Sequence, residues 1–131
     1  MKNSKVLIFL LLSFIFISTA EAQFNRTIDA TIAINDSNCV FDLGTRKLAA
    51  VIMPATVTAA TFAVQTTDDT TGTETWYPVY YDGSAVTITA TDGKMMGVPP
   101  VQINQLMRYV RLVGNVKEAA ARTLKIVWTN F

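Results

Sequence analysis

The sequence predicts an antiparallel β-sandwich of about eight strands, and three observations lead to this fold class. Beyond an apolar N-terminus, apolar residues recur at every second position far more often than at helical spacing, and threonine, valine and isoleucine dominate the regular stretches. Two Asp-Gly turns, at residues 82–83 and 92–93, are typical of a meander of short strands. No predicted strand is followed by a helix long enough for a parallel crossover, which excludes parallel α/β folds.

Three strands are predicted in the first half of the domain. Residues 28–34 alternate between apolar and mainly polar side chains, and the Asn-Asp-Ser-Asn turn at 35–38 ends this strand. Residues 48–53 are continuously apolar, as in a strand covered on both faces, and Pro54 ends the run because proline cannot donate to a ladder. Residues 61–66 alternate again. The residues expected on one face of the first and third strands are Ile28, Ala30, Ile32, Ile34, Phe62, Val64 and Thr66.

The middle of the chain is predicted to form hairpins. The polar residues 67–73 suit a hairpin connection. Residues 76–81 follow as a strand, and Pro78 predicts that this strand lies at a sheet edge or a bulge. After the first Asp-Gly turn, residues 86–91 alternate between apolar residues and threonine, and the second turn leads into a short strand at 94–98.

Two further strands are predicted towards the C-terminus. The Pro-Pro pair at 99–100 breaks the strand pattern, and residues 101–107 are expected to form a short helical turn or a loop. Residues 108–113 alternate, and residues 115–121 are a loop or a weak helical turn. Residues 123–128 close the fold, with Leu124, Ile126 and Trp128 on one face.

The N-terminus has the three parts of an export signal. Lys2 and Lys5 form a positive region, residues 6–17 form an apolar region interrupted only by Ser13, and Ala-Glu-Ala at 20–22 is a small-x-small cleavage pattern. The alternative is a membrane anchor, which needs about 20 apolar residues. We predict a signal peptide at residues 1–22, a single β-sandwich domain at residues 23–131, and no stable membrane span after cleavage.

Charge and cysteine content limit the partners and the means of stabilisation. Removing the signal takes away two of 11 basic and one of 10 acidic groups, so the net charge falls from +1 to zero. A balanced charge gives no reason to expect nucleic acid as a partner. Cys39 is the single cysteine and cannot form a disulfide within its own chain. It leads into Val40 and Phe41, so it is predicted to be a buried small hydrophobe, and a reactive thiol is the alternative.

Motifs for catalysis are missing from the sequence. The chain has no histidine, which removes the usual general base and imidazole metal ligand. It also has no P-loop, no dinucleotide-binding glycine motif, no Cys-x-x-Cys pair and no EF-hand spacing. The carboxylates of Asp68, Asp69, Glu74, Asp82 and Asp92 fit turn chemistry, with glycoside hydrolysis or a calcium site as the alternatives. The sequence therefore predicts no enzyme activity, no metal site and no cofactor.

The aromatic run at 76–81 is the candidate binding surface, and its side chains are Trp76, Tyr77, Tyr80 and Tyr81. On one continuous strand, Trp76 and Tyr80 point to one side and Tyr77 and Tyr81 to the other. One set is expected to fill the core or cover its neighbours. The outward set would then form an apolar platform for a sugar ring or a neighbouring subunit.

Two arginines complete the candidate site. Arg108 and Arg111 lie on one predicted strand, and the planar guanidinium group suits carboxylates and sugar hydroxyls. The alternative is that they form internal ion pairs with loop carboxylates.

Parts of the domain resemble a group of small tailed-phage and prophage proteins. The shared features are Pro54-Ala55-Thr56-Val57-Thr58-Ala59-Ala60-Thr61-Phe62-Ala63-Val64-Gln65, the later Asp82-Gly83, and Arg108-Tyr109-Val110-Arg111-Leu112. Val57 stands where that group usually has tryptophan. These proteins are similar to discoidin-like, galactose-binding jelly rolls, and the resemblance spans residues 48–127. It implies a jelly-roll fold and a non-enzymatic virion or surface component.

Two hypotheses of function follow. The first is an exported, non-catalytic binding or assembly module at a surface, secreted or periplasmic, whose partner is a glycan or protein subunits, including copies of itself. The second is a phage virion structural protein, such as a head decoration or fibre component, located in the virion.

Overall fold

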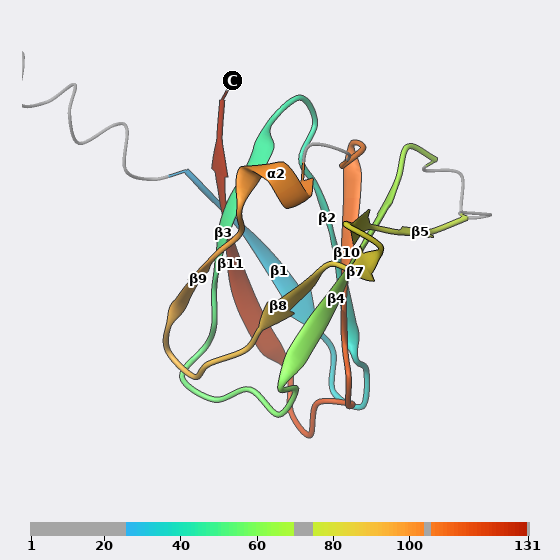
Figure 1. Ribbon diagram of the computed structural model, residues 1–131. Coiled ribbons are helices and arrows are strands. Elements are labelled where there is room, and N and C mark those ends of the chain that lie inside the picture. The colour runs from blue at the N-terminus through green and yellow to red at the C-terminus, as the bar shows by residue number, and fades with distance from the viewer. Residues whose placement is uncertain (1–25, 70–74, 104–105, 131) are drawn as a thin grey trace, which may run out of the picture.

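The computed structural model describes residues 26–69, 75–103 and 106–130 as two antiparallel sheets packed face to face (Figure 1). One sheet has the strand order β1 (Thr27–Ile32), β11 (Arg122–Thr129), β3 (Lys47–Ile52) and β9 (Met95–Gly97). The other has the order β2 (Asn38–Asp42), β10 (Tyr109–Gly114), β4 (Thr61–Thr67) and β5 (Tyr77–Pro78), and β8 (Thr87–Thr89) also pairs with β4. The predicted all-β sandwich is confirmed, and the predicted signal peptide at 1–22 lies outside the described residues.

Two small elements complete the described structure. The strands β6 (Tyr80–Tyr81) and β7 (Ser84–Ala85) form a separate hairpin, and the four-residue helix α2 (Pro100–Ile103) follows β9. The helix agrees with the expected short helical turn after the Pro-Pro pair. In the part of the chain that the structure describes, no helix has the length and apolarity needed to cross a membrane.

The core lies between the two sheets and is built from the alternating residues of their inner faces. The side chains exposed by less than 1% include Ile32, Val51, Phe62, Val110, Leu112, Leu124 and Ile126. Both sheets contribute to this set, so each sheet covers the apolar face of the other. Cys39 belongs to the same core and is 3% exposed, and burial raises the pKa of its thiol from 9.0 to about 12. The prediction of a buried small hydrophobe is confirmed.

Two predicted strands differ from the pattern in detail, and two observed strands were not predicted. β1 ends at Ile32, and Ile34 is 60% exposed, because the chain turns at Asn35 with a positive φ of 62°. β11 has an irregular register between Val127 and Trp128, and Trp128 is half-buried and packs against the core, in line with its predicted face. β2 and β7 are strands that the period-two pattern did not predict as separate elements.

The predicted strand at 76–81 is divided, which is the main correction to the sequence interpretation. β5 pairs with β4 as the last strand in the path of its sheet, in agreement with the edge position predicted from Pro78. Val79 still donates to the Val64 carbonyl of β4, and beyond it β6 pairs with β7 instead of with β4. Asp82 and Gly83 have φ values of 50° and 74°, which fits a two-residue turn of type I′ between these strands.

Acidic and amide side chains fix the loop between β3 and β4 at residues 54–60. Five consecutive backbone N–H groups, at residues 57–61, donate to such side chains. The acceptors are Asp92 for Val57 (2.9 Å), Glu118 for Thr58 and Ala59 (2.9 and 3.0 Å), and Asn115 for Ala60 and Thr61 (2.9 and 3.3 Å). A loop without ladder partners thereby satisfies its backbone donors.

Glu118 is the buried member of this set, with 1% of its surface exposed. Its carboxylate also lies 3.5 Å from Nε of Arg122. Burial raises the pKa of Glu118, but the hydrogen bonds from Ala59 and Thr58 and the charge of Arg122 outweigh burial, so the pKa lies below its ordinary value of 4.5. The buried group is therefore an ionised carboxylate at neutral pH.

Candidate functional site

The outer face of the five-stranded sheet carries the predicted site. Alternation along β4 and β10 places Val64, Val110 and Leu112 in the core, so Gln65 and Arg111 point to the opposite face. The register then aligns one row across the sheet, consisting of Val40, Arg111, Gln65 and Pro78. We call this row and the side chain of Trp76 the outer platform.

Trp76 and Arg111, which the sequence singled out separately, contact each other. The guanidinium carbon of Arg111 lies 4.6 Å from the centroid of the Trp76 ring, within the range of a cation–π contact. Nε of Arg111 donates a 2.8 Å hydrogen bond to Oε1 of Gln65, and its Nη2 donates to the same oxygen. The cluster is half-buried, which limits the rotamers available to all three side chains.

Arg108 has a different role from Arg111. Its Nε and Nη2 donate to the two carboxylate oxygens of Asp42 at 3.1 and 2.8 Å, which is a bidentate ion pair. Its guanidinium also lies 5.0 Å from the ring centroid of Tyr109. The hydrogen bond from Arg108 lowers the pKa of Asp42 below 3.8. Arg108 therefore forms an internal ion pair, which was the alternative given by the sequence. Its partner, Asp42, is the last residue of β2.

The three tyrosines of the aromatic run are exposed. Tyr77, Tyr80 and Tyr81 are 51%, 52% and 40% exposed. Val79 enters the core instead, because its N–H donates to the Val64 carbonyl at 3.0 Å and its carbonyl accepts from Val86 at 2.8 Å. The prediction of two alternating sets on one strand is therefore wrong, since the division of the strand leaves Tyr77, Tyr80 and Tyr81 outside the core.

Two of the loop acidic residues take part in local structure. Asp92 accepts the Val57 N–H, and Asp82 occupies the type I′ turn. The N–H of Asp69 donates to the hydroxyl of Thr67 at 3.2 Å. Glu74 lies outside the described residues. Within those residues, no three acidic, histidine or cysteine side chains gather as they would around a metal ion.

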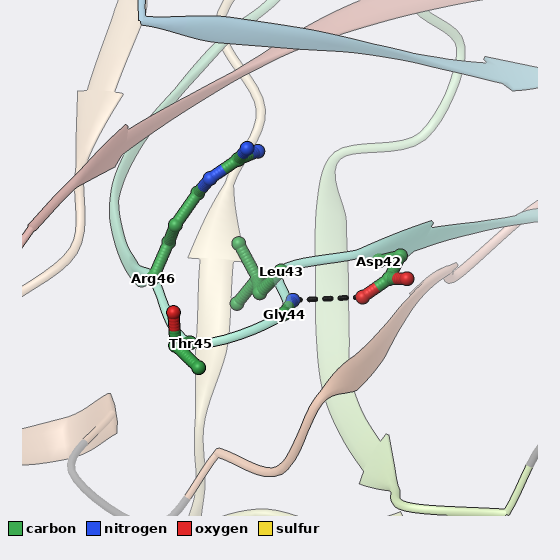
Figure 2. A pocket seen from close by; sticks show the side chains of 5 residues that line it. All are labelled: Asp42, Leu43, Gly44, Thr45 and Arg46. Carbon is green, nitrogen blue, oxygen red and sulfur yellow. Dashed lines mark hydrogen bonds between the residues drawn. The ribbon is translucent and has the colours of Figure 1, made fainter.

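A pocket lies beside Asp42, at the turn between β2 and β3, and sequence reasoning missed it. It has a volume of about 350 Å³ and is lined by Asp42, Leu43, Gly44, Thr45 and Arg46 (Figure 2). Gly44 has a φ of 60°, and its N–H donates to Oδ1 of Asp42 at 2.7 Å. No motif marks the pocket, because a Leu-Gly-Thr turn is common between strands. The one feature of the sequence that could have indicated the pocket is Arg46, the basic residue that follows this turn.

Comparisons of this chain with models of protein families, with curated proteins and with solved structures find no match. The functional interpretation therefore depends on the residues of the site.

Proposed function

We propose that this protein is an exported, non-catalytic binding module that recognises carbohydrate with the outer platform. The observation that carries the proposal is the cluster of Trp76, Arg111 and Gln65 on the outer face of the five-stranded sheet. An indole ring, a guanidinium group and an amide held together on a sheet face offer both an apolar surface and hydrogen-bonding groups.

These groups match the chemistry of a sugar ring. An aromatic side chain supplies a large apolar contact that the C–H face of a sugar can cover, and its geometry is rigid. Arginine presents several donors in a planar fork that suits hydroxyl oxygens. An apolar surface with a few polar groups is the usual composition of a small-molecule site.

The lack of catalytic groups supports a binding role. The chain has no histidine. Of the carboxylates suggested for hydrolysis, Asp82 and Asp92 take part in turn and loop structure. The alternation of successive strands between the two sheets, from β1 to β4 and from β9 to β11, supports the predicted jelly-roll arrangement. The export pattern at residues 1–22 supports a secreted or periplasmic location.

Assembly with protein subunits is the second candidate function. Three exposed tyrosines and Val40, which is 49% exposed, favour it, because tyrosine is enriched where proteins meet. In this case these exposed side chains would contact neighbouring subunits of a virion or of a cell-surface assembly.

A glycan array with the purified protein tests the proposal. We expect binding by the parent protein and loss of binding in the Trp76→Ala variant. Lys125→Ala is the matched control, because it removes an exposed cation from the other sheet. If the parent binds no glycan above background, the carbohydrate proposal is wrong. In that case, concentration-dependent sedimentation that Tyr80→Ser abolishes would favour assembly.

A further inference from the structure

The pocket at the turn between β2 and β3 is a second concave feature, outside the outer platform. Its volume of about 350 Å³ is near the lower limit for small-ligand sites and suits a ligand of one or two rings. Figure 2 shows Arg46 and Asp42 on opposite sides of Leu43, and Thr45 on the same side as Arg46. The wall thus combines a cation, a carboxylate and a hydroxyl.

Arg46, which lines the pocket, shares one aromatic ring with a second arginine. The guanidinium carbon of Arg46 lies 4.1 Å from the centroid of the Trp128 ring, and that of Arg26 lies 5.7 Å from the same centroid. Among the described residues, no carboxylate lies within ion-pair distance of either arginine. Two like charges at one ring repel each other, so an anion beside Arg46 would be stabilised.

Asp42 forms its ion pair with Arg108 and not with Arg46, although the charge of Arg46 also contributes to lowering the pKa of Asp42. The bidentate contact with Arg108 and the hydrogen bond from Gly44 occupy both carboxylate oxygens. Each oxygen can still accept a further hydrogen bond, since a carboxylate has about four acceptor positions. The pocket therefore offers an acceptor at Asp42 on one side and donors at Arg46 and Thr45 on the other.

We infer that this pocket binds an acidic sugar, with the ligand carboxylate at Arg46 and a ligand hydroxyl donating to Asp42. A simple inorganic anion would meet Asp42 without a hydroxyl to offer, and a neutral sugar would leave Arg46 without a counter-ion. A ligand that carries both a carboxylate and hydroxyls satisfies both sides of the pocket. The inference concerns a site separate from the outer platform and does not depend on the function proposed for that surface.

Titration of the ¹⁵N-labelled purified protein with sodium glucuronate, followed by amide chemical shifts, tests this inference. We expect saturable shifts at Gly44, Thr45 and Arg46 with glucuronate, and no saturable shifts with glucose or sodium sulfate. Because a charge-assisted hydrogen bond is lost, Arg46→Gln should weaken binding by about tenfold. Arg46→Lys should recover part of that loss.

The control variant is Lys125→Gln, which removes an exposed cation from β11 and should leave glucuronate binding unchanged. Unfolding temperatures of the variants show whether each one is folded. The inference is overturned if glucuronate causes no saturable shifts in the folded parent, or if glucose or sulfate binds equally well. It is also overturned if folded Arg46→Gln binds as the parent does.

Discussion

Replacing Glu118 by glutamine tests how the loop at residues 54–60 is fixed. The carboxylate accepts the N–H groups of Thr58 and Ala59 and faces Arg122, and it is almost completely buried. Glutamine has a similar shape but only one acceptor oxygen, and its NH₂ group must face either a backbone N–H or the guanidinium. The substitution therefore removes charge from two hydrogen bonds and introduces a buried donor without an acceptor.

The expected cost follows from these contacts. Hydrogen bonds to a charged group contribute about 1 kcal/mol more than neutral ones, so two of them account for about 2 kcal/mol. A buried unsatisfied donor adds about 1 kcal/mol or more. We therefore expect Glu118→Gln to lower the free energy of unfolding by about 3 kcal/mol. For a domain of about 100 residues this corresponds to a decrease in unfolding temperature of roughly 12 °C.

Thermal and urea unfolding followed by circular dichroism measure this effect. Asp29→Asn is the matched control, because Asp29 also loses an ion pair, with Lys125 at 3.0 Å, but the pair is exposed. Exposed ion pairs contribute little, so the control should unfold close to the parent. A decrease below about 1 kcal/mol in Glu118→Gln, or an equal decrease in the control, would refute the reasoning.

The effect of pH gives a second measurement on the same variant. The pKa of Glu118 is lower in the folded protein than its ordinary 4.5. The stability from its ionised form is therefore fully present above about pH 4.5 and is lost as the pH falls through the folded pKa. The stability difference between parent and Glu118→Gln should be largest at neutral pH and shrink below pH 4.5. A difference that stays constant on acidification would contradict an ionised Glu118.

Two further predictions concern the core and the hairpin. Burial raises the pKa of Cys39 to about 12. A thiol reagent at pH 8 should therefore label the native protein at least about a hundredfold more slowly than the unfolded protein. Rapid labelling of the native protein would contradict this prediction. Gly83→Ala should destabilise the protein by about 1 kcal/mol in urea unfolding, because Gly83 has a φ of 74°. Gly97→Ala, where the added methyl meets open space and φ is not in the left-handed region, should not destabilise it, and equal effects would refute the turn geometry.

The period-two pattern predicted the strands that have one clear inner face. β4 and β10 are examples, because Phe62, Val64, Val110 and Leu112 must be buried while their neighbours face outward. The pattern failed at Tyr77 and Tyr81, which it placed on the same side of a strand as Val79. Val79 is buried and bonded to Val64 and Val86, whereas both tyrosines are exposed.

The candidate site was predictable in its residue types but not in its pairings. Trp76 and Arg111 meet because β5 and β10 both flank β4, and that strand order is a property of the whole sheet. Glu118 gave no local signal, since it stands between lysine and alanine and its amide partners are 59 and 60 residues away in the chain. The partners of Asp42 and Arg46 are likewise far away in the chain, since Asp42 pairs with Arg108 and Arg46 contacts Trp128.

The proposed carbohydrate platform is tested most directly by isothermal titration calorimetry with a glycan selected on the array. We predict that Trp76→Ala weakens binding by roughly thirtyfold, the effect of losing an aromatic contact of about 2 kcal/mol at the centre of a site. Lys125→Ala should bind as the parent does. Equal affinity of the parent and a folded Trp76→Ala variant would contradict the central claim that this face of the sheet binds carbohydrate.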